Sequence, residues 1–207
     1  MAKTAALGRR VELVPMDPHC QDITIALYRQ EAADGPRYQV HSFSGRPGVV
    51  ARLDFVAGAT AVLGGMAAVG PGQVRFACGG AHELAARRAF LEACKLDPAQ
   101  PLAARPLQFF DKKTGHQIHV APLGGGVYQV ALEGGDAGRA AAVAGGLVKL
   151  GQMQNPAPDQ AAFPCGQAHD ALIGLLVVRA VNVRATLREQ EMQAARGQLA
   201  APSAQQQ

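Results

Sequence analysis

The chain has 207 residues, of which 48% are hydrophobic and 17% charged, so it can bury a core as one or two small domains. Its net charge of +4 is scattered and not interleaved with aromatic residues, which disfavours a nucleic-acid-binding protein. Four dispersed cysteines, no apolar stretch near the roughly 18–20 residues that span a bilayer, and no secretory signal predict a cytoplasmic protein without disulfides or membrane spans.

The first half of the sequence predicts three strands, a helix, a strand and a second helix. Alternating Ile23, Ile25 and Leu27 are typical of a strand, and the glycine pair that follows Leu63 is typical of a helix C-terminus. After a flexible leader over 1–10, the predicted strands are 11–15, 22–28, 37–44 and 73–78, and the predicted helices are 49–64 and 82–96. These elements form a predicted first repeat over 11–98.

The same element order restarts in a predicted second repeat over 105–196. Its predicted strands are 107–110, 117–121, 127–132 and 162–165, and its predicted helices are 137–150 and 168–196. Residues 197–207 are polar and low in complexity, which predicts a disordered and dispensable tail.

The two halves also match residue by residue, with an offset of 87 and no gaps. The matched positions include Arg52 with Arg139, Cys78-Gly79 with Cys165-Gly166, and Ala81-His82 with Ala168-His169. With a small shift, Tyr38-Gln39-Val40 meets Tyr128-Gln129-Val130. We therefore predict a mixed α/β fold, of the α+β two-layer kind, built by tandem duplication of a β-β-β-α-β-α unit around a pseudo-two-fold axis.

Each half carries one Cys-Gly-x-Ala-His-acid motif at a predicted strand-to-helix turn. A cysteine and a histidine from each motif make four ligands of the kind zinc prefers, so Cys78, His82, Cys165 and His169 are candidate metal ligands. A nucleophilic thiolate with a histidine base is a second interpretation. A third is an anion pocket at the helix N-termini, bound by the amides of Gly79 and Gly166.

A purely structural role for the motifs stays open beside these three. Cysteine is a common small core residue, glycine serves tight turns, and histidine with an acid can cap a helix.

Other residues complete the predicted site. His82 and His169 are candidate ligands or acid/base groups, and Glu83 and Asp170 would orient them as neighbouring carboxylates. Arg52 and Arg139, at predicted helix starts, are candidate contacts for an anionic small molecule. His116 and His119 would point to opposite faces of one strand, so a shared metal there is disfavoured.

The doubled element order resembles the duplicated architecture of the imidazoleglycerol-phosphate dehydratase family, whose halves have the ribosomal protein S5 domain 2-like fold. That family binds manganese through repeated His-His-x-x-Glu helix openings, and Ala81-His82 and Ala168-His169 fall at these positions. Ala85 and Leu172 replace the expected glutamates, so the resemblance implies the fold and the place of a site, and not the dehydratase activity. The fold class also includes a zinc-dependent lipid-A deacetylase and a pterin-dependent formaldehyde-activating enzyme.

The first functional prediction is a small-molecule enzyme, a metal-dependent lyase, dehydratase or hydrolase with zinc or another divalent metal. The absence of a dinucleotide-binding fingerprint disfavours a redox enzyme. The alternative is a non-catalytic binding or scaffold protein with a structural zinc site. Fold analogy adds one-carbon or pterin metabolism as a weaker alternative, and the predicted last helix adds docking on a partner. A homo-oligomer stays open.

Overall fold

The computed structural model describes residues 7–20, 23–43, 48–111 and 115–181. Within them the chain is a mixed α+β structure with two antiparallel sheets and four helices. The predicted tail over 197–207 and the predicted last helix beyond 181 lie outside the described residues, as does the leader up to residue 6. The first strand begins at Arg9, so the predicted leader extended two residues too far.

The first half forms a five-stranded sheet and two helices. Its elements are β1 (Arg9–Val14), β2 (Ile25–Gln30), β3 (Arg37–Ser42), α1 (Val49–Gly64), β4 (Ala67–Gly70), β5 (Gln73–Arg75) and α2 (Glu83–Ala93). The strand order is β1-β2-β3-β5-β4, and each neighbouring pair is antiparallel. Burial alternates along β3, where Tyr38, Val40 and Ser42 face the core, because successive side chains of a strand point to opposite faces.

The second half forms a four-stranded sheet and two helices. Its elements are β6 (Gln108–Asp111), β7 (His116–Gly124), β8 (Val127–Leu132), α3 (Ala137–Gly151), β9 (Gln160–Ala162) and α4 (Asp170–Ala180). The strand order is β6-β7-β8-β9, again antiparallel throughout. The N-terminus of helix α3 is capped by Asp136, whose side chain accepts a hydrogen bond from the Arg139 amide.

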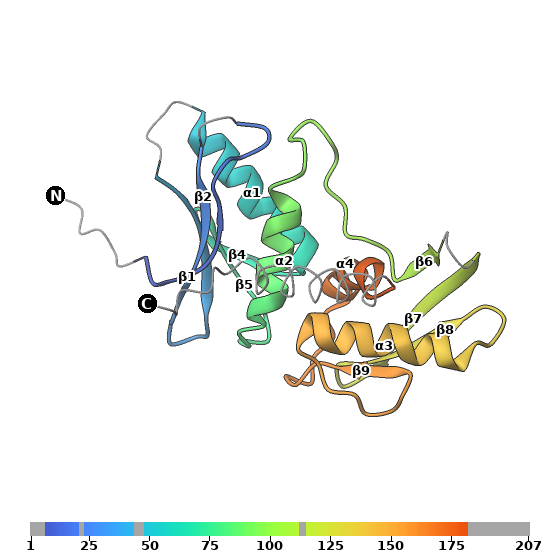
Figure 1. Ribbon diagram of the computed structural model, residues 1–207. Coiled ribbons are helices and arrows are strands. Elements are labelled where there is room, and N and C mark those ends of the chain that lie inside the picture. The colour runs from blue at the N-terminus through green and yellow to red at the C-terminus, as the bar shows by residue number, and fades with distance from the viewer. Residues whose placement is uncertain (1–6, 21–22, 44–47, 112–114, 182–207) are drawn as a thin grey trace, which may run out of the picture.

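The helices gather between the two sheets and join the halves (Figure 1). Helix α1 contacts α4, and α2 contacts both α3 and α4. One hydrophobic cluster includes residues of both halves, among them Phe76 and Phe90 from the first and Phe163 and Leu176 from the second. The two halves therefore share one core and pack on each other through their helices.

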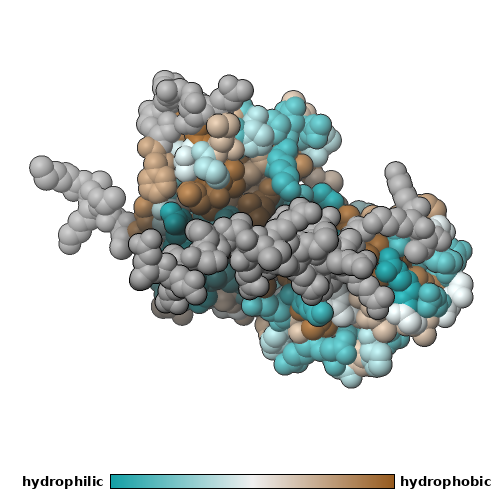
Figure 2. Space-filling model, viewed as in Figure 1, coloured by the Kyte–Doolittle hydropathy of each residue, from teal (hydrophilic) through white to brown (hydrophobic). Residues whose placement is uncertain are grey.

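Exposed apolar side chains are more concentrated on the first half than on the second. Figure 2 shows apolar side chains gathered on the first half, whereas the visible second half is mixed in character. Met16, Phe43 and Val50 are each more than half exposed there.

Among the helices of the described residues, none combines the length and the hydrophobicity needed to cross a membrane.

Candidate metal centre

Both motifs lie where a short strand turns into a helix. Cys78 follows β5, and His82 is the residue before α2; Cys165 follows β9, and His169 is the residue before α4. The turn between each pair depends on a glycine in the left-handed region, with φ of 70° at both Gly79 and Gly166 in the two motifs. The tight strand-to-helix turn predicted from the motif is present in both halves.

The four candidate ligands come together in space. Their ligand atoms, the two Sγ and one ring nitrogen of each histidine, all lie within 4.8 Å of one another. The distance from Cys78 Sγ to His82 Nε2 is 3.1 Å, and from Cys165 Sγ to His169 Nε2 it is 3.2 Å. His169 is buried, and the other three are partly buried. The sequence left open whether Cys78, His82, Cys165 and His169 converge, and the structure brings them within reach of one metal ion. We call this group the Cys/His cluster.

Two phenylalanines enclose the imidazoles of the cluster. The Phe76 ring lies 5.0 Å from the His82 ring and 5.6 Å from that of His169. The Phe163 ring lies 4.7 Å from the His169 ring and 5.5 Å from that of His82. The two imidazole centroids are 4.7 Å apart, and all these contacts are edge-to-face. Each phenylalanine thus contacts its own histidine and the histidine of the other half.

Burial sets the charge state of the cluster. It lowers the pKa of His82, and burial together with the neighbouring His82 lowers the pKa of His169 to about 4. Burial raises the pKa of the Cys78 thiol, with the nearby Cys165 adding to the effect. At neutral pH the imidazoles are therefore uncharged, which is the form that binds a metal ion.

Two tyrosines hold the helix starts beside the cluster. The Tyr38 hydroxyl donates to the carbonyl of Ala81, and the Tyr128 hydroxyl donates to the Asp170 carboxylate at 2.7 Å. The Tyr128 oxygen also accepts a hydrogen bond from the His169 amide at 2.6 Å. Burial raises the pKa of both phenols, so both stay protonated and able to donate. These two tyrosines match each other in the sequences of the two halves, but nothing in that match indicated this role.

The predicted orienting carboxylates have other partners. Glu83 forms ion pairs with Arg9 and Arg29, and Asp170 accepts the hydrogen bond from Tyr128. Within the described residues, no hydrogen bond joins either carboxylate to an imidazole. Glu83 and Asp170 therefore anchor the helix starts, and their role in orienting the histidines stays a prediction.

The predicted anion pocket also lacks its donors. The Gly79 amide donates to the Phe76 carbonyl at 3.1 Å, and the Gly166 amide donates to the Phe163 carbonyl at 3.0 Å. Both hydrogen bonds close the turn that the left-handed glycine makes. The two amides are thus occupied within the protein, and ligand binding through Gly79 and Gly166 is corrected to turn formation.

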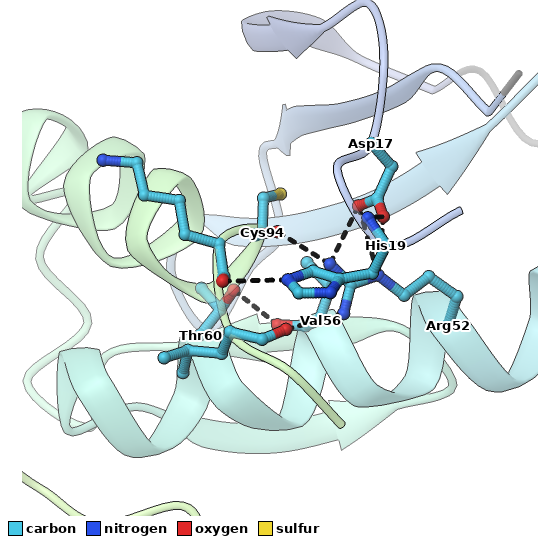
Figure 3. Close-up of polar contacts among 8 residues, drawn as sticks. Asp17, His19, Arg52, Val56, Thr60 and Cys94 are labelled. Carbon is cyan, nitrogen blue, oxygen red and sulfur yellow. Dashed lines mark hydrogen bonds and ion pairs between the residues drawn. The ribbon is translucent and has the colours of Figure 1, made fainter. Parts of the chain in front are cut away.

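Arg52 is a structural residue at the start of α1 (Figure 3). Its guanidinium forms three hydrogen bonds of 2.9–3.1 Å to the fully buried Asp17 carboxylate, together with bonds to the carbonyls of Cys94 and Leu96. All three of its nitrogens therefore have acceptors within the protein. The prediction that Arg52 contacts an anionic ligand is corrected, because its charge is neutralised by Asp17.

Arg139 makes the matching contacts in the second half. Its guanidinium binds the Asp111 carboxylate at 2.9 Å and the Val181 carbonyl at 3.1 Å. Val181 follows α4 as Cys94 follows α2, with the same offset that relates Arg139 to Arg52. Each arginine ties the start of one helix to the end of the next, so Arg139 is a structural anchor, and its contact with an anionic ligand stays a prediction.

The remaining histidines lie outside the cluster. A ring nitrogen of His19 bonds to the Lys95 carbonyl at 2.9 Å, and His41 packs edge-to-face with Tyr28 and Phe43. His116 and His119 lie in β7, opposite residues of β6. No metal-competent group other than the Cys/His cluster occurs within the described residues.

Comparison with known proteins adds no relative: no family model matches the chain, and neither the curated proteins nor the solved structures contain a match. The resemblance to the imidazoleglycerol-phosphate dehydratase family accordingly stays a prediction. The Cys/His cluster is therefore the feature of the molecule that bears on its function.

Proposed function

We propose that the protein binds one zinc ion through Cys78, His82, Cys165 and His169. The observation that supports this is the convergence of four ligand atoms within 4.8 Å from two motifs far apart in the sequence. Two thiolates and two imidazoles are a ligand set that zinc commonly takes in proteins.

The distances between the ligand atoms fit such an ion. With bonds of about 2.3 Å to sulfur and 2.0–2.1 Å to nitrogen, and angles of about 109°, the four donors would lie roughly 3.3–3.8 Å apart. The Cys–His pairs, at 3.1 and 3.2 Å, would open by a few tenths of an ångström. The widest pair, at no more than 4.8 Å, would close by about 1.5 Å at most, which is within reach of side-chain rotation.

Charge supports the same ligand set. Two thiolates neutralise the two positive charges of Zn²⁺, and neutral imidazoles add none, so the complex carries no net charge. A neutral complex suits a partly buried site lined by Phe76 and Phe163, because an unbalanced charge there would be costly. The depressed pKa values of His82 and His169 remove competition from protons at neutral pH.

We propose a structural role for this ion. Four protein ligands complete the tetrahedral shell, whereas a catalytic zinc keeps one position open for water or substrate. The ligands come in equal number from the two halves, so the ion would fasten the turn before α2 to the turn before α4. A scaffold with structural zinc is therefore better supported than the metal-dependent lyase or hydrolase.

We also propose that the halves arose by duplication and are related by a pseudo-two-fold axis. Three sets of contacts support this: the matching anchors of Arg52 and Arg139, the reciprocal Phe76 and Phe163 contacts, and the His82–His169 contact. In a two-fold interface, if a residue of one half contacts a position in the other half, then its counterpart contacts the matching position in the first half. Phe76 with His169 and Phe163 with His82 follow this pattern. The Cys/His cluster would then lie on the axis.

Cobalt substitution tests the proposed site. Co²⁺ replaces zinc in the purified full chain, and its visible absorption distinguishes four-coordinate thiolate sites from six-coordinate oxygen sites. We expect intense visible bands together with sulfur-to-cobalt charge transfer in the near ultraviolet. Cys20→Ser, at a partly buried cysteine outside the cluster, is the control and should leave the spectrum unchanged. Weak octahedral bands in the unsubstituted protein would contradict the proposal.

A further inference from the structure

The two cysteines of the cluster differ from the other two in the chain. Cys20, Cys78 and Cys165 are all partly exposed, but the cluster places the sulfur atoms of Cys78 and Cys165 within 4.8 Å of each other. They belong to different halves and follow β5 and β9, on short turns. Two thiols that are close together and reachable from solvent are the arrangement from which a disulfide forms.

We propose that the zinc centre is also a redox switch, in which a peroxide oxidises Cys78 and Cys165 to one disulfide and so releases the metal. This inference rests on the proposed zinc site, and it adds a regulation of that site by a two-electron oxidant. One thiolate attacks the peroxide, breaking the O–O bond and forming a sulfenic acid. The second thiolate then attacks that sulfur and expels hydroxide.

With hydrogen peroxide as the oxidant, the electrons, bonds and protons of the reaction balance. Two electrons pass from the two sulfurs to hydrogen peroxide, the S–S bond forms, and both Zn–S bonds break. The two departing hydroxides balance the charge of the released Zn²⁺, and the acid form of the buffer converts them into two waters. Zn²⁺ is then left with only His82 and His169, too few protein ligands to hold it in a tetrahedral site.

Oxidation would leave the two halves joined. The disulfide would join the same two turns that the metal joined, before α2 and before α4. The sulfurs must approach from at most 4.8 Å to about 2.05 Å. Oxidation would therefore exchange a metal fastening for a covalent one, so that zinc leaves while the halves stay attached.

The other two cysteines are poor competitors. Cys94 is buried, and burial raises the pKa of its thiol to about 12, so almost none is present as the reactive thiolate. Cys20 lies in the loop between β1 and β2, in a bridge with Asp17, and is not part of the cluster. Selectivity for Cys78 and Cys165 follows from their mutual distance.

The test uses the zinc-loaded full chain, treated with one equivalent of hydrogen peroxide. Released zinc is measured with a chromogenic chelator, and disulfides are mapped by mass spectrometry of unreduced peptides. We expect one zinc released per Cys78–Cys165 disulfide, two of the four thiols lost, and recovery of zinc binding after dithiothreitol and added zinc. Cys20→Ser should behave as the unsubstituted chain does.

Each other outcome has a definite meaning. If zinc is bound at the start but leaves without a Cys78–Cys165 disulfide, or stays bound while thiols are lost elsewhere, the switch is overturned and the zinc site stands. If dithiothreitol and zinc do not restore binding, the reaction is damage and not a switch. If the chain holds no zinc before peroxide is added, the proposed function fails and the switch fails with it.

Discussion

Glu92 in α2 and Arg179 in α4 form an ion pair with each other, and they lie 87 residues apart, the offset that also relates Cys78 to Cys165. The two-fold arrangement of related halves that we propose would bring such matched positions into contact at its axis. Glu92 additionally binds Lys95 at 3.1 Å. The contact between α2 and α4 thus follows the same relation as the Cys/His cluster.

This ion pair makes a prediction about pH. Burial alone would raise the pKa of Glu92, but hydrogen bonds from Lys95 and Arg179 outweigh it and hold that pKa below its ordinary 4.5. A carboxyl whose folded pKa is lowered contributes stability above the unfolded pKa, and this contribution is lost as pH falls through the folded pKa. NMR titration should place the Glu92 pKa below 4.5, and Arg179→Gln should raise it. A value at or above 4.5 in the unsubstituted chain would refute the prediction.

Loss of Arg52 should destabilise the protein strongly. Arg52→Met leaves the fully buried Asp17 carboxylate without its ion pair, and breaking a buried pair in this way costs about 3–5 kcal/mol. The measurement is the free energy of unfolding in urea. Arg139→Met is the matched control, because the Arg139 side chain is 24% exposed, against 4% for Arg52, and it should lose less. An equal loss in the free energy of unfolding for both variants would mean that the burial of the arginine does not determine how much its ion pair stabilises the protein.

Two adjacent glycines of α3 should respond in opposite ways. A Cβ at Gly146 would lie 2.8 Å from the Ala180 carbonyl oxygen of α4, whereas one at Gly145 meets nothing within 4 Å. Gly146→Ala should therefore destabilise by about 1–3 kcal/mol through overpacking. Gly145→Ala should stabilise by roughly 0.5–1 kcal/mol through helix propensity. Thermal unfolding measures both, and a neutral Gly146→Ala would mean that α3 and α4 pack less closely than described.

Removal of the metal should lower the melting temperature. An ion present at about 1,000 times its dissociation constant stabilises the folded state by about 4.1 kcal/mol. For a chain of this length, that corresponds to a shift of roughly 8–16 °C. Scanning calorimetry with and without a zinc chelator measures the shift, and Cys78→Ser, which lacks one ligand, should show almost none. A chelator effect of the same size in Cys78→Ser would place the metal elsewhere.

The helices and most strands were predictable because their signals are local. Predicted and observed ranges coincide for α1 and β8, where helical spacing with a terminal glycine pair and strand alternation are clear. The short strand β4 was missed, because Ala67–Gly70 has small residues without alternation. Strands β5 and β9 end at Arg75 and Ala162, earlier than predicted, because the motif turns begin immediately after them.

The members of the Cys/His cluster were predictable from the sequence, but their convergence and their surroundings were not. Cys78 and His82 share one turn, so their proximity follows from the motif, and the repeat relates them to the second pair. The partner of Arg52 is Asp17, 35 residues away in a different loop, and nothing local to Arg52 indicates that pairing. The partners of Glu83 are likewise distant, since Arg9 and Arg29 reach it from β1 and β2.

The central claim is that one zinc ion is held by the Cys/His cluster, and metal analysis of the purified full chain tests it most directly. After saturation with zinc and removal of unbound metal, we expect one zinc per chain. Cys165→Ser should retain far less than one, and Cys20→Ser should retain one as the control. Less than a tenth of an equivalent in the unsubstituted chain, or a full equivalent in Cys165→Ser, would contradict the account.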